Sequence, residues 1–85
     1  MSMITELIAA ISNAERQIDD QIGKLNSYKS QISQVKTQVE NAFGGSQSQD
    51  ANAMLQQLSS TETQINETIS NLQNAKDKLL RVRAI

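Results

Sequence analysis

The chain has 85 residues, a formal net charge of −1, and neither Cys nor His. Disulfides and the usual zinc ligands are therefore excluded, and a chain this short without such staples usually depends on oligomerisation or a partner. The small net charge and an aromatic content of only 2% argue against nucleic-acid binding.

The N-terminal stretch MSMITELIAAI is partly apolar, but Glu6 interrupts it and no basic segment or small-residue cleavage site accompanies it. It predicts neither a signal peptide nor a membrane span. We expect a protein that is cytoplasmic or is exported without a cleavable signal peptide to the cell surface or medium.

A seven-residue repeat of apolar residues, typical of a coiled-coil heptad, covers the first half of the chain. The segment from Met3 to Ala42 contains no Pro and one Gly, so the repeat predicts one helix over about 3–42. The residues three positions after the repeat, the d row, are apolar or aromatic except at Gln21. The repeat itself, here named the a row, consists of Ile4, Ile11, Ile18, Leu25, Ile32 and Val39.

The same interval continues in the second half and predicts a helix over about 49–83, after a turn over about 43–48. Ser46 and Ser48 are candidate N-caps, and Asp50 lies in the first turn, where the helix dipole favours an acidic residue. Basic residues gather near the helix end, as the dipole also favours. The main apolar row of this helix is Leu58, Ile65, Leu72 and Leu79.

The apolar rows of the two segments align if the chain folds back on itself, because the numbers of facing residues then sum to a constant 90. The centre of this fold-back is Gly45, and Gly44 and Ser46 on either side also indicate a turn. The sequence therefore predicts an all-α fold, an antiparallel two-helix hairpin over 1–85 that completes a helical bundle with a partner or a second copy. The expected facing pairs are Leu58 with Ile32, Ile65 with Leu25, Leu72 with Ile18, and Leu79 with Ile11.

Polar residues interrupt the predicted interface between the helices. Tyr28 faces the region of Thr61 and Glu62 in this alignment, and we expect its hydroxyl to bond Glu62 or water.

Further apolar residues flank the main rows, so the apolar stripe is wider than two helices require. We interpret the excess as a face for further helices; the alternative is that these side chains merely border the hairpin interface. The candidate partner-binding residues are Ile8, Ile22, Phe43, Gly45, Leu55 and Ile69.

The sequence offers no pattern that favours catalysis or a cofactor. It has no glycine-rich phosphate loop and no nucleophile elbow, and it lacks His and Cys. Glu15, Asp19 and Asp20 could be considered for a divalent metal, but Arg16 stands among them and a solvated acidic face is favoured. We expect a protein that is not an enzyme and binds no metal.

The central residues Phe43, Gly44 and Gly45, between two helices of similar length, resemble the WXG family of small helical hairpins handled by bacterial type VII secretion. Phe replaces the family's usual Trp. Members with their own export signal have a Tyr followed after three residues by an acidic residue beyond the second helix, and the C-terminal LLRVRAI has no such pattern. The chain is most similar to the small partner proteins of LXG-type toxins.

This resemblance implies a targeting partner, or chaperone, that binds the N-terminal helical domain of an LXG-type toxin, with a second small helical protein as a further partner. It implies that Phe43 seals the hairpin end and contributes to the recognised surface, and that Gly45 gives the turn its backbone freedom. Two other hypotheses stay open: a self-assembling structural hairpin subunit, and a coiled-coil adaptor that forms a homodimer. Hairpins of the first kind have Pro in the turn, which this chain lacks.

Overall fold

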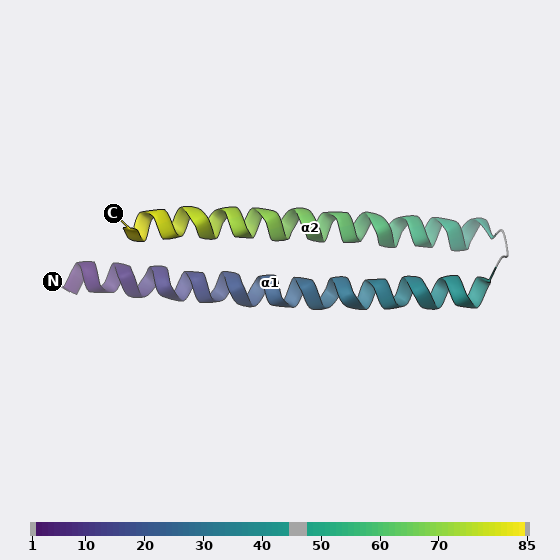
Figure 1. Ribbon diagram of the computed structural model, residues 1–85, viewed down its shortest axis with the longest axis horizontal. Coiled ribbons are helices and arrows are strands. Elements are labelled where there is room, and N and C mark those ends of the chain that lie inside the picture. The colour runs from purple at the N-terminus through teal and green to yellow at the C-terminus, as the bar shows by residue number, and fades with distance from the viewer. Residues whose placement is uncertain (1, 45–47, 85) are drawn as a thin grey trace.

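Two long helices, α1 (Ser2–Phe43) and α2 (Gln49–Ala84), lie side by side in opposite directions (Figure 1). The computed structural model describes residues 2–44 and 48–84, and the molecule measures 67 × 15 × 14 Å. The predicted all-α antiparallel hairpin is confirmed. Each helix begins and ends within one residue of its expected bounds.

Helix α1 ends where a glycine adopts a left-handed backbone. Gly44 has a φ of 45°, which residues with a Cβ rarely adopt, and its N–H donates to the carbonyl oxygen of Glu40 at 2.9 Å. This bond satisfies one of the last carbonyls of the helix. The Phe-Gly junction of the sequence is thus the helix end, while Gly45 lies outside the described residues.

Helix α2 begins with a serine cap. The Ser48 hydroxyl accepts a hydrogen bond from the N–H of Ala51 at 3.3 Å, and the Ser48 carbonyl accepts one from the N–H of Asn52 at 3.1 Å. These bonds make Ser48 the N-cap, as expected. The other candidate cap, Ser46, lies outside the described residues.

The surface between the helices, here called the seam, is formed on α1 by the a row together with the residues four positions after it, the e row. Ile11 is 5% exposed, and Ile22 is half-buried, whereas Tyr28 of the d row is 56% exposed. The prediction that the d row packs in the seam is therefore wrong. The reason lies near the middle of the hairpin, where the e row has apolar Ile22 and the d row has polar Gln21. Burying the e row there removes more apolar surface from water.

The relative position of the helices also differs from the prediction. Hydrogen bonds join Lys29 to Asn66, Ser33 to Glu62, and Asp19 to Lys76, and the residue numbers of each pair sum to 95. Those of the ion pairs Lys36–Glu62 and Glu15–Arg83 sum to 98, so all five sums exceed the predicted 90. The prediction aligned apolar rows with each other. In the structure, the a row faces the second row of α2, which contains Glu62, Ile69 and Lys76, so the register differs by more than one helical turn.

A cross-linking experiment distinguishes the two registers. Cysteines at Ser33 and Glu62, whose side chains are 2.9 Å apart at Oγ and Oε2, should be joined within one chain by a short bifunctional thiol reagent. The chain has no Cys of its own, so the only products come from the introduced pair. The matched control has cysteines at Ile32 and Leu58. Faster cross-linking of the control would support the predicted register instead, in which the numbers of facing residues sum to 90.

Candidate protein-interaction surface

A network of polar side chains links the closed half of the hairpin. The Glu62 carboxylate accepts hydrogen bonds from Lys36 Nζ at 2.8 Å and from Ser33 Oγ at 2.9 Å. The hydrogen bond from Lys36, followed by that from Ser33, lowers the pKa of Glu62, and the charge of Lys29 acts in the same direction. Lys29 Nζ itself donates to Asn66 at 2.9 Å.

Two ion pairs join the helices nearer their free ends. Lys76 Nζ lies 2.7 Å from Asp19 Oδ1, and this hydrogen bond raises the pKa of Lys76. Arg83 lies 3.0 Å from Glu15. Two of the three carboxylates considered for a metal, Glu15 and Asp19, are thus paired with basic residues of α2. The described residues contain no group of acidic side chains arranged to hold an ion.

On α1 these contacts involve residues of the e row or residues one position after the a row, and on α2 they involve the corresponding positions. They therefore lie along one edge of the hairpin. We name it the ion-pair edge. Each of these partly exposed contacts adds little stability on its own. The ion-pair edge consists of Glu15, Asp19, Lys29, Ser33, Lys36, Glu62, Asn66, Lys76 and Arg83.

The opposite side of the hairpin has no charged residue in its central rows. On each helix these residues lie three positions after a seam row, and because the helices are antiparallel both rows fall on the same side. Leu7 and Val82, one from each helix, accordingly line a common cleft. We name this side the uncharged face: Leu7, Ala14, Gln21, Tyr28, Val35, Ala42, Met54, Thr61, Thr68, Ala75 and Val82.

Large apolar side chains stand exposed on this face. Tyr28 is 56%, Val35 42% and Met54 45% exposed. The Tyr28 hydroxyl does not bond Glu62, one of the two partners expected for it, because Glu62 lies on the ion-pair edge with Lys36 and Ser33. The uncharged face therefore presents an aromatic ring and aliphatic groups to solvent without ion pairs among them.

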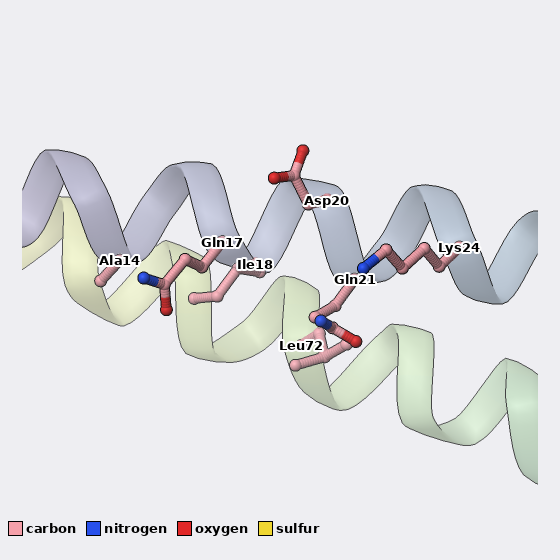
Figure 2. Close-up of a pocket in the computed structure, with 7 residues that line it drawn as sticks. All are labelled: Ala14, Gln17, Ile18, Asp20, Gln21, Lys24 and Leu72. Atoms are coloured by element: carbon pink, nitrogen blue, oxygen red, sulfur yellow. The ribbon is translucent and has the colours of Figure 1, made fainter.

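A cleft of about 470 Å³ opens on the uncharged face (Figure 2). Ile18 of α1 and Leu72 of α2 both line the cleft, together with Ala14. The small Ala14 side chain leaves this space open, and the Asp20 carboxylate points away from Leu72. The remaining lining residues are Gln17, Gln21 and Lys24.

A second apolar cleft, of about 410 Å³, lies at the open end of the hairpin. There the beginning of α1 extends past the end of α2 (Figure 1). Ile4 and Leu7 are 66% and 56% exposed, whereas Ile11, alongside α2, is only 5% exposed. The cleft is lined by Ile4, Leu7, Ile8, Ile11, Val82 and Arg83.

The candidate partner-binding residues fall into three groups. Ile22, Leu55 and Ile69 lie in the seam, with Ile69 only 9% exposed, which favours the alternative that they belong to the hairpin interface. Their side chains pack against the other helix of the same hairpin. Ile8 is exposed at the open end, while Gly45 lies outside the described residues.

Phe43, the last candidate, is 43% exposed at the closed end of the hairpin. Its ring lines a small cleft of about 150 Å³ together with Val39 and Leu55. It therefore covers part of the end of the seam and still presents surface to solvent.

Comparison of the chain with known protein families, curated proteins and solved structures finds no match. Within the described parts of α1 and α2, no segment combines the length and the apolar character that crossing a membrane requires. The uncharged face, with exposed Leu7, Tyr28, Val35, Met54 and Val82, is the candidate surface for binding another protein.

Proposed function

We propose that this protein is a non-enzymatic docking partner whose uncharged face packs against the helices of another protein. The observation that supports the proposal most directly is the separation of charge: the ion pairs between the helices lie on one edge, and the opposite face has none. A helix that packs on the central rows of this face would bury no charged side chain there, while Asp20 and Lys24 would lie at its border. Exposed Tyr28 and Val35 offer the apolar contacts that such packing needs.

We further propose that the partner is the N-terminal helical domain of an LXG-type toxin, which the protein delivers to a type VII secretion apparatus. The resemblance at Phe43, Gly44 and Gly45 supports this partner. A long helical domain also matches a binding face that extends along a 67 Å hairpin. Phe43 stands apart at the closed end, where it would remain accessible to the secretion machinery after the toxin is bound.

Co-expression with the tagged N-terminal helical domain of an LXG-type toxin from the same organism tests binding, and we expect the two proteins to co-purify. Deletion of the gene should abolish export of the toxin, and Phe43→Ala should reduce export more than it reduces co-purification. Wild-type export from the deletion strain would refute the targeting role even if the two proteins bind.

A further inference from the structure

The open end of the hairpin exposes four large apolar side chains within two turns of one helix. Each of them is between 48% and 80% exposed, because α1 extends past the end of α2 there (Figure 1). Over residues 3–11, these side chains and Ile11 fill a sector about 140° wide around the helix, and no polar side chain interrupts it. We name the four residues the apolar tip: Met3, Ile4, Leu7 and Ile8.

Basic residues stand beside the apolar tip at the end of α2. Among residues 76–84 four are basic and one is acidic. Two of the four take part in the ion pairs with α1, whereas Lys78 and Arg81 form none with a described residue. Arg81 comes two residues after Leu79 of the seam, so it lies on the side of α2 that faces away from α1. The uncovered side of the apolar tip faces in the same direction.

This combination suits a lipid surface better than a protein. An uninterrupted apolar sector with basic side chains beside it is typical of helices that lie in the surface of an anionic membrane. Interfaces between proteins usually contain about one hydrogen bond per 100–200 Å², and the apolar sector has no polar side chain to form one. The sector also lies at the end of a molecule 67 Å long, where a flat surface can reach it without contacting the middle of the hairpin.

We propose that the open end of the hairpin docks on the surface of an anionic lipid bilayer. The apolar tip enters the boundary between headgroups and acyl chains, and Lys78 and Arg81 contact the lipid phosphates. The tip is already part of α1, so docking requires no helix to form. The docking is reversible, because the tip is short and only two basic residues are free of ion pairs. This inference does not depend on the identity of the protein partner.

Co-sedimentation of the purified full chain with vesicles tests the docking. We expect the chain to bind vesicles of equal parts phosphatidylglycerol and phosphatidylcholine at least about tenfold more tightly than vesicles of phosphatidylcholine alone. Ile4→Asp should weaken this binding at least about tenfold, because it replaces an apolar contact by a carboxylate. Ile4 is 66% exposed, so the free protein can hydrate the new charge and stay folded. Val35→Asp is the matched control, since it adds the same charge at an exposed apolar residue away from the open end, and it should bind like the wild type.

Charge substitutions test the role of the basic residues. Replacing Lys78 and Arg81 together by Gln should weaken binding to the mixed vesicles roughly tenfold to thirtyfold, whereas Lys24→Gln, nearer the middle of the hairpin, should have no effect. Glu6→Gln should strengthen binding about fivefold, because it removes the acidic side chain next to the apolar tip. Raising the salt concentration from about 0.1 M to 1 M should weaken binding by the wild type, since the Debye length then falls from about 10 to 3 Å.

A single tryptophan locates the contact. The chain has no Trp, and Met3 is 80% exposed, so Met3→Trp introduces one probe at the tip. Its fluorescence should shift to shorter wavelength when mixed vesicles are added, whereas that of Met54→Trp, near the closed end, should not.

Equal affinity of the wild type for both kinds of vesicle, or equal fluorescence shifts for Met3→Trp and Met54→Trp, would overturn the inference. An Ile4→Asp variant that binds vesicles like the wild type but no longer captures the toxin domain would also overturn it, because the tip would then be a protein-binding site. Failure of the wild type to capture the toxin domain, with vesicle binding intact, would instead refute the proposed function alone.

Discussion

Ile69→Asp is expected to destabilise the isolated hairpin strongly. Ile69 is only 9% exposed and lies near the middle of α2. The substitution removes a buried apolar contact and places a carboxylate in the seam, at a cost of about 3 to 5 kcal/mol. Because this cost approaches the whole stability of a small domain, about 5 kcal/mol or a little more, thermal melting followed by far-UV circular dichroism should show a steep fall in the melting temperature.

The matched control for this substitution is Ser70→Asp, which introduces the same charge at the next residue, on an exposed position. We expect Ser70→Asp to keep its helical signal and its melting temperature within a few degrees. If Ile69→Asp proved as helical and as stable as the control, the seam described here would have the wrong rows.

Val35→Asp is expected to abolish capture of the toxin domain while leaving the hairpin folded. Val35 is 42% exposed on the uncharged face, so the free protein can hydrate the new carboxylate. In the complex the charge would be buried against an apolar helix without a partner, which costs several kcal/mol and weakens binding about a hundredfold or more. The measurement is the amount of this protein that co-purifies with the tagged domain.

Gln34→Asp provides the control, since it adds the same charge at the neighbouring exposed position, away from the uncharged face. It should bind like the wild type. Equal binding by both variants would show that the partner uses another surface, and the open-end cleft around Ile4 and Ile8 would then be the next candidate.

The helices and their ends could be predicted from the sequence because the relevant physics is local. An unbroken heptad series predicts a long helix. The glycines after Phe43 indicate where α1 ends, and the cap at Ser48 indicates where α2 begins. These features depend on residues within one or two turns, and the structure agrees with them.

The register could not be predicted in the same way because it depends on contacts between residues far apart in the sequence. Aligning apolar rows treats Lys36 and Glu62 as surface residues, whereas in the structure both side chains are mostly buried and form an ion pair between the helices. Once Ile22 and Ile69 are placed in the seam, the binding surface moves to the row that contains Tyr28. The prediction of Ile22 and Ile69 as partner contacts followed from the wrong choice of rows.

The antiparallel arrangement has a consequence for the order in which the molecule folds. Partners across the hairpin are 26 residues apart at Lys36 and Glu62, 37 apart at Lys29 and Asn66, and 57 apart at Asp19 and Lys76. The entropy lost on closing a loop grows with its length, so pairing beside the turn costs least and brings the next pair within reach. We therefore expect the chain to zip from the turn toward its termini, and to open in the reverse order.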